Sequence, residues 1–237
     1  YHNPATARAY EGYKAVQAFK RRQNTTDEDV IGLLDRSNVS VLDENSNKDA
    51  AIVSTQRDLI AGEVSKDIAR RKLIPTDILE AHDSGAIHFH DMDYIIQPMF
   101  NCCLINLEDM LNNGTVINGK KIDTPKSFQV ACTVTTQIIA QVASGQYGGQ
   151  SINGIDRILA PFVRKSYEKI LNNVIEEQVE IYGMEPNMEK AREIAWKRTR
   201  KEVKDGIQTI QYQINTLMTT NGQSPFVTLF MYFKPDY

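Results

Sequence analysis

The stretch PMFNCCLINLEDML, residues 98–111, places two adjacent cysteines, Cys102 and Cys103, inside an apolar run. Residues 99–107 are apolar at both odd and even positions. This pattern predicts a strand buried on both faces, as in a parallel sheet or the wall of a barrel. Successive side chains of a strand point to opposite faces, so only one of the two cysteines can face a given pocket. The pattern alone favours core packing for both, since free cysteine is among the most buried residue types.

The sequence on either side of this strand predicts an α/β protein. Upstream, we expect helices from Asn3, over 25–36 with a capping box formed by Thr25 and Glu28, over 54–73, and over 76–84 capped by Thr76. Downstream, we expect a hairpin within 112–123, helices over 126–144, 151–177 (kinked at Pro161) and 187–220, and a strand after 224. Residues 1–85 therefore read as a helical region, and residues 86–237 as a domain whose strands are far apart in sequence.

The composition excludes several classes of function. The 237 residues carry a formal net charge of −3, which argues against nucleic acid or an anionic membrane as a broad partner. No apolar run reaches the roughly 18–20 residues of a membrane helix. Three cysteines form no disulfide framework, which predicts a reducing, cytoplasmic setting. The first residue is Tyr1 and the last residues predict an apolar strand, so we expect a piece of a longer protein.

Three polar clusters are candidates for chemistry. In HFHDMDY, His88 and His90 would share one face of a strand, which suits a metal site, a polar active-site wall or merely structural histidines. A metal would need further ligands that the neighbouring sequence does not offer, so we expect none. SGQYGGQSIN, residues 144–153, is glycine-rich but matches no phosphate-binding motif. TTNGQSPFVT, residues 219–228, is an amide-rich turn before a strand, and an ordinary turn explains it equally well.

Taken together, several blocks resemble a known family, the anaerobic (class III) ribonucleoside-triphosphate reductases. The blocks occur in the family's order: IHFHDMDY, MFNCCLINLEDMLNNGTVINGK, PKSFQVACTVTTQIIAQVASGQYGGQSIN, ILAPFV and INTLMTTNGQSPFVT. The resemblance implies half of a ten-stranded α/β barrel of the glycyl-radical enzyme type over 86–237. Residues 1–85 would hold the end of an ATP-cone linker and helices of the dimer and effector region. The implied reaction reduces ribonucleoside triphosphates to deoxyribonucleoside triphosphates.

The same resemblance assigns a role to one of the two cysteines. In this family a glycyl radical converts a finger-loop cysteine to a thiyl, and a second cysteine in an Asn-Cys-x-Leu motif acts on the opposite face of the ribose. Asn101, Cys102 and Leu104 match that motif, so Cys103 would face outer packing. A buried thiol stays protonated at neutral pH and can donate hydrogen toward the leaving 2′-hydroxyl. The substrate or formate pocket would be lined by His88, His90, Asn101, Asn221, Gln223 and Ser224.

The resemblance also implies deoxynucleoside triphosphate effectors bound at the interface of a homodimer, with ATP as a further effector. Lys126, at the start of the predicted helix 126–144, would meet a phosphate with the help of the helix dipole, and Gln137 would hydrogen-bond the effector. A surface lysine and an interface glutamine are equally compatible with the sequence. Other implied partners are a radical-SAM activating enzyme and, as reductant, formate or a small thiol protein.

The sequence also departs from the family's pattern. It lacks the finger-loop cysteine, the glycyl-radical segment and the zinc-binding cysteines beside it, so we expect these 237 residues to be inactive alone. Two further readings stay open: a non-catalytic half that binds deoxynucleotides and dimerises, and a different glycyl-radical enzyme with another substrate. A purely structural interaction protein leaves the two polar clusters HFHDMDY and NGQSPF unexplained.

Overall fold

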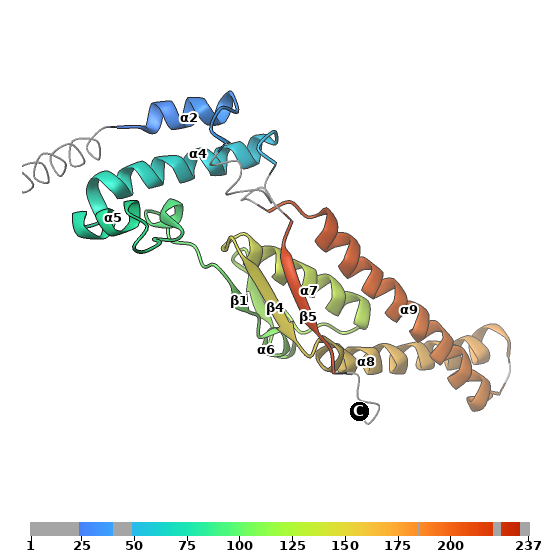
Figure 1. The fold of residues 1–237 in the computed structure, drawn as a ribbon. Coiled ribbons are helices and arrows are strands. Elements are labelled where there is room, and N and C mark those ends of the chain that lie inside the picture. Colours follow the sequence, from blue (N-terminus) through green and yellow to red (C-terminus); the bar gives the residue numbers. More distant parts are fainter. Residues whose placement is uncertain (1–23, 40–48, 184, 220–223, 233–237) are drawn as a thin grey trace, which may run out of the picture. The chain divides into compact units, whose positions relative to one another are not determined.

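The structure, a computed structural model, describes residues 24–39, 49–183, 185–219 and 224–232 (Figure 1). It divides into two compact units, with the boundary between Met99 and Phe100, and each unit is described by itself. Residues 86–99 thus belong to the first unit, whereas the sequence suggested a boundary after residue 85. The helix predicted from Asn3 lies outside the described residues.

The first unit is helical. It contains α2 (Thr26–Leu34), α4 (Val53–Ile68), the π-helical turn η1 (Ala69–Leu73), α5 (Thr76–Asp83) and the 3-10 turn η2 (Met92–Tyr94). Asp67 on α4 is buried, and it accepts hydrogen bonds from the Arg71 guanidinium at 2.7 and 2.6 Å and from the Thr26 hydroxyl at 2.5 Å. The hydrogen bonds from Arg71 lower the pKa of Asp67, so the buried carboxylate stays charged and ties α2 to α4.

Two predicted helix caps are wrong in detail. Thr25 is the N-cap residue of α2, but its side chain makes no capping hydrogen bond, so the capping box does not form. Instead, the Asn24 side chain accepts from the Thr26 N–H at 3.0 Å. The N-cap residue of α5 is Pro75 rather than Thr76, and the helix ends before Gly85, whose φ of 76° favours a glycine.

The second unit contains a parallel sheet covered by helices. Along the chain it runs β1 (Cys103–Leu104), α6 (Leu107–Asn112), β2 (Thr115–Ile117), β3 (Lys120–Ile122), α7 (Phe128–Ala143), β4 (Gly149–Asn153), α8 (Ile155–Glu176), η3 (Glu177–Ile181), α9 (Met188–Thr216) and β5 (Phe226–Phe230). The sheet order is β1-β4-β5, and both pairings are parallel (Figure 1). This confirms the α/β class. Three described parallel strands do not by themselves establish half of a ten-stranded barrel.

The predicted hairpin is present as β2 and β3. The turn residues Asn118 and Gly119 have φ values of 49° and 73°, which is the backbone that an Asn-Gly turn between antiparallel strands requires. The helix predicted over 126–144 is α7. The helix predicted over 151–177 is α8, and it continues through Pro161, whereas residues 151–153 belong to strand β4.

The strand around the two cysteines differs from the prediction. Only Cys103 and Leu104 are paired as a strand, because Asn106 caps α6 and the chain turns helical at Leu107. Helices cover one face of the sheet, where Cys103, Ile152 and Val227 join the core. On the other face Leu104 is 83% exposed and Phe100 is 79% exposed, so burial on both faces is wrong for the described chain.

Helix α7 is the centre of the second unit. Its buried residues Phe128, Ala131, Ile138 and Ile139 belong to the core that also includes β4, α8 and α9. Helix α9 approaches α7 closely at Gly206, where an added Cβ would lie 2.6 Å from the Phe128 ring. This close approach explains a glycine in the middle of a 29-residue helix.

The first turn of α7 is held by side chains from two other helices. The buried Ser166 hydroxyl, from α8, accepts from the Phe128 N–H at 2.8 Å and donates to Glu202 of α9 at 2.8 Å. Glu202 also accepts from the Gln129 N–H at 3.1 Å. The N–H groups that a helix start leaves unpaired are therefore satisfied inside the protein.

No helix among the residues that the structure describes is both long and apolar enough to span a bilayer.

Replacing Ser166 with alanine is expected to lower the free energy of unfolding by about 1–3 kcal/mol, because the buried Phe128 N–H loses its acceptor. Ser144→Ala, at an exposed hydroxyl bonded to its own helix, is the matched control and should change the value by less than about 0.5 kcal/mol. Urea denaturation followed by circular dichroism measures both. Equal effects of the two substitutions would contradict this account of the α7 start.

Candidate functional site

The strongest candidate site surrounds Cys102 at the amino end of β1. The Cys102 thiol is exposed and donates to the side-chain oxygen of Asn101 at 3.2 Å. The Asn101 carbonyl accepts from the Gly148 N–H at 2.7 Å, just before β4. The prediction that Cys102 is buried is wrong for the described chain, because no described element covers this face. The thiol is thus fixed by a neighbour and open to a ligand.

The strand register identifies the other residues of this open face. Cys103 pairs with Gln150, so Cys102 is level with Gly149, and Gly149 is in turn level with Phe226 on β5. The next residues on the same face, two positions further along each strand, are Leu104, Ser151 and Thr228. The face therefore combines a thiol and two hydroxyls with apolar side chains, and glycine leaves space beside the thiol. Ser151 and Thr228 belong to two of the polar clusters in the sequence, but only the strand pairing places them on the same face of the sheet as Cys102.

The other two cysteines face the protein interior. Cys103 is half-buried against the core, and burial is the main reason why its pKa is raised, with a smaller contribution from Cys102. Cys132 on α7 is fully buried, and burial, followed by the charge of Glu202, raises its pKa to about 12. This agrees with the prediction that Cys102 and Cys103 face opposite ways, and Cys132 serves packing.

The two predicted site histidines lie together in the first unit. His88 Nε2 and His90 Nδ1 are 3.0 Å apart, and His90 Nε2 lies 3.3 Å from an Asp91 carboxylate oxygen. The segment is irregular rather than a strand, so the rings meet through a turn in which Asp91 has a φ of 55°. In the described part of the chain, no three His, Cys, Asp or Glu side chains gather as metal ligands would. The histidines and Cys102 belong to different units.

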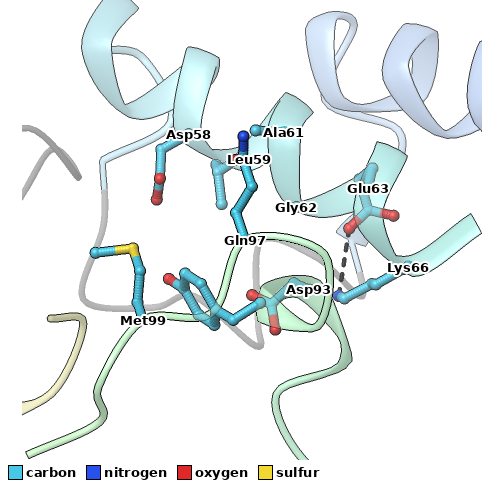
Figure 2. Close-up of a pocket in the computed structure, with 10 residues that line it drawn as sticks. Asp58, Leu59, Ala61, Gly62, Glu63, Lys66, Asp93, Gln97 and Met99 are labelled. Atoms are coloured by element: carbon cyan, nitrogen blue, oxygen red, sulfur yellow. Dashed lines mark ion pairs between the residues drawn. The ribbon is translucent and has the colours of Figure 1, made fainter. Parts of the chain in front are cut away.

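A small polar pocket in the first unit was not predicted (Figure 2). Its volume is about 50 Å³, and it is lined by Asp58, Glu63 and Lys66 of α4 together with Asp93 and Tyr94. Lys66 Nζ lies 3.3 Å from the buried Glu63 carboxylate, and burial, helped by the nearby carboxylates, raises the pKa of Tyr94. The pocket has room for a few water molecules but not for a nucleotide. Charged residues at helical spacing on α4 were its only sequence signal.

Of the two predicted effector residues, Gln137 lies on α7, whereas Lys126 precedes the helix. Gln137 is exposed and borders a hollow of about 300 Å³ between α7 and α9. A pair formed by the Thr136 hydroxyl and the Gln213 side chain is part of its wall. Lys126 is exposed two residues before the first helical residue, Phe128, and Gln137 lies nine residues, or about 14 Å, further along the helix axis. The N–H groups of the first turn already have acceptors, so a phosphate at Lys126 would depend on the lysine charge rather than on those N–H groups.

The last predicted residues lie at the entry to β5. Ser224 is exposed two residues before the strand, whereas Asn221 and Gln223 lie outside the described residues. Because the three strands are parallel, Ser224, Cys102 and Gly148 all precede their strands at the amino edge of the sheet. Open α/β sheets usually bind ligands at the opposite, carboxyl edge.

Comparison with solved structures identifies the fold class. The structure resembles the crystal structure of the anaerobic ribonucleotide reductase from Thermotoga maritima in complex with dATP and CTP, with a TM-score of 0.58 and 16% sequence identity over 94% of this chain and 35% of that one. A second anaerobic ribonucleotide reductase gives a TM-score of 0.55 at 14% identity. The described elements therefore have the fold of part of this class of reductase.

Sequence comparison gives the family. The family model for anaerobic ribonucleoside-triphosphate reductase matches residues 44–237, and the chain belongs to this family. It is 44% identical over 227 residues to the reductase of Haemophilus influenzae and 46% identical over 224 residues to that of Escherichia coli. These matches cover 95% and 94% of this chain but 31% and 30% of the relatives. Phage T4 has a 42% identical relative. The chain thus spans about a third of the relatives it matches.

The three thiols are expected to react with iodoacetamide in the order Cys102, Cys103, Cys132. Alkylation needs an accessible thiolate, and burial both hides the other two sulfurs and raises their pKa. Cys132 should stay unmodified in the native chain, because its sulfur is fully buried and burial raises its pKa to about 12. Mass spectrometry of timed samples measures the order, with urea-unfolded chain as the control in which the three rates converge. Faster labelling of Cys103 than of Cys102 would contradict the assigned faces.

Proposed function

We propose that this chain forms part of an enzyme that reduces ribonucleoside triphosphates to deoxyribonucleoside triphosphates, with Cys102 as a hydrogen-donating thiol. The observation that carries the proposal is the Cys102 thiol, exposed on the open face of a parallel sheet and hydrogen-bonded to Asn101. Family membership supports the same assignment. The overall reaction replaces the ribose 2′ C–O bond with a C–H bond and releases water.

The environment of Cys102 suits this role. A thiol carries a hydrogen that it can donate toward the leaving 2′-hydroxyl. Asn101 holds the S–H in one direction, and the absence of a side chain at Gly149 leaves room for a sugar ring. The family resemblance also assigns substrate or formate binding to His88, His90, Asn221, Gln223 and Ser224.

The remaining parts of the proposal concern sequence that these 237 residues do not contain. The open face would be the interior of a ten-stranded barrel of the glycyl-radical type, of which β1, β4 and β5 form a portion. A glycyl radical installed by a radical-SAM activating enzyme would supply the thiyl that removes the ribose 3′-hydrogen. Formate or a thiol protein would supply the two electrons, and zinc would belong to the missing segment.

Regulation by ATP and deoxynucleoside triphosphates in a homodimer is the second element of the proposal. The hollow beside Gln137 supports it, because amide and hydroxyl groups of α7 and α9 line a space next to an exposed helix face. A crystal structure of a class member that contains dATP and CTP is consistent with nucleotide sites in this fold. The alternative function, deoxynucleotide binding without chemistry, rests on the same hollow.

In the full-length reductase, Cys102→Ala is expected to reduce deoxynucleotide formation by at least about 10³-fold, since no other described group on the face can donate a thiol hydrogen. Cys103→Ala is the matched control, because this neighbour faces the core. It should retain activity within a few-fold. Anaerobic turnover with radical content quantified by electron paramagnetic resonance distinguishes lost chemistry from lost activation. Full activity of the Cys102 variant would reject the assignment.

The 237 residues alone are expected to bind deoxynucleoside triphosphates but to give no deoxynucleotide product when mixed with activating enzyme. Gln137→Ala should weaken effector binding about tenfold, consistent with the loss of one or two hydrogen bonds. Gln178→Ala, on the turn after α8, is the control substitution. Isothermal titration calorimetry and product chromatography measure the two parts. Deoxynucleotide product from the isolated chain would contradict its expected inactivity. Unchanged affinity of the Gln137→Ala variant would contradict the role of Gln137 in effector binding.

A further inference from the structure

The loop before β4 runs alongside the residues before β1. The Tyr147 N–H donates to the Phe100 carbonyl at 3.2 Å, and the Gly148 N–H donates to the Asn101 carbonyl at 2.7 Å. The buried Gln146 side chain donates back to the Gly148 carbonyl at 3.2 Å, within its own loop. Gly148 is therefore fixed on both its N–H and its carbonyl side, directly against Asn101.

The space next to Gly148 has no room for a side chain. A Cβ at this position would lie closer than 3.0 Å to both the side-chain oxygen and the carbonyl oxygen of Asn101. The backbone of Gly148 is not in the left-handed region, so its need for glycine comes from this contact and not from its conformation. The side-chain oxygen in question is the one that accepts the Cys102 S–H.

We infer that Gly148 is a positioning residue, which sets the direction of the Cys102 thiol by leaving Asn101 the space it occupies between the two strands. This inference rests on the function proposed above for Cys102. A side chain at position 148 would collide with both the side-chain oxygen and the carbonyl oxygen of Asn101, so the Asn101 amide has to move away from its present place. The S–H then loses its acceptor and turns away from its present direction.

Neighbouring glycines do not share this role. At Gly145, in the same loop, an added Cβ would have one neighbour, the Val142 carbonyl at 3.7 Å, which is an ordinary contact. At Gly149 the nearest atoms belong to Phe226 and lie at 3.8 Å. Gly145→Ala is therefore a matched control, because it adds the same methyl group to the same loop without touching Asn101.

The experiment measures the S–H stretching band of Cys102 in the full-length reductase by Raman spectroscopy. Subtracting the spectrum of Cys102→Ser isolates this band from those of the other thiols. In Gly148→Ala the band is expected to move to higher wavenumber, as for a thiol without an acceptor, and Asn101→Ala should give the same shift. Gly145→Ala should leave it unchanged. An unshifted band in a folded Gly148→Ala protein overturns the inference.

Turnover separates this inference from the proposed function. We expect kcat of Gly148→Ala to fall by about 10²-fold, as for a small displacement of a reacting group, with Gly145→Ala near wild type. A shifted band with unchanged kcat supports the positioning role and contradicts the proposed role of Cys102 itself.

A double-mutant cycle provides the test if Gly148→Ala folds poorly. Because Asn101→Ala removes one of the two colliding oxygens, Asn101→Ala/Gly148→Ala is expected to melt at a higher temperature than the sum of the single effects predicts. Additive melting temperatures mean that Gly148 does not act through Asn101, and they overturn the inference.

Discussion

The packing of α7 against the sheet is the interaction on which the rest of the second unit depends. The helix contributes more buried residues to the core of this unit than any other described element, and its first turn is held by Ser166 and Glu202 from α8 and α9. On β4 the buried Gln150 donates to the Ile139 carbonyl of α7 at 3.1 Å. The helices thus cover one face of the sheet and fix the strands, so that the opposite face can remain open.

That asymmetry gives two adjacent cysteines different chemistry. Cys103 packs against the helix-covered core, where burial disfavours its thiolate, whereas Cys102 lies on the open face with an amide acceptor for its hydrogen. Successive side chains of a strand point to opposite faces of the sheet, so two adjacent cysteines are separated in this way without any special residue at either position. The glycines before and within β4 do the rest, since Gly148 leaves space for Asn101 and Gly149 leaves space beside the thiol.

Local patterns predicted much of the fold, and contacts distant in sequence account for most of what was missed. The Asn118-Gly119 turn and the apolar stripe of α7 are encoded within a few residues, so both were correctly expected. The open face of the sheet was not predicted, because a run of apolar residues does not reveal whether another element covers them. Likewise, Thr25 is a residue type that often caps a helix, but the Asn24 side chain accepts the hydrogen bond from the first turn instead. In the candidate site, Cys102 was predicted from a family motif. The role of Gly148 was not, because it depends on a contact with Asn101, which is distant in sequence.

The central claim is that the ribose of the substrate lies on the open face of the sheet, beside Cys102. The most direct measurement is a structure of the full-length reductase with a bound ribonucleoside triphosphate. The account predicts the Cys102 sulfur within hydrogen-bonding distance of the ribose 2′-hydroxyl, with Cys103 still packed against the helices. A ribose bound away from Cys102, or on the helix-covered side of the sheet, would contradict it.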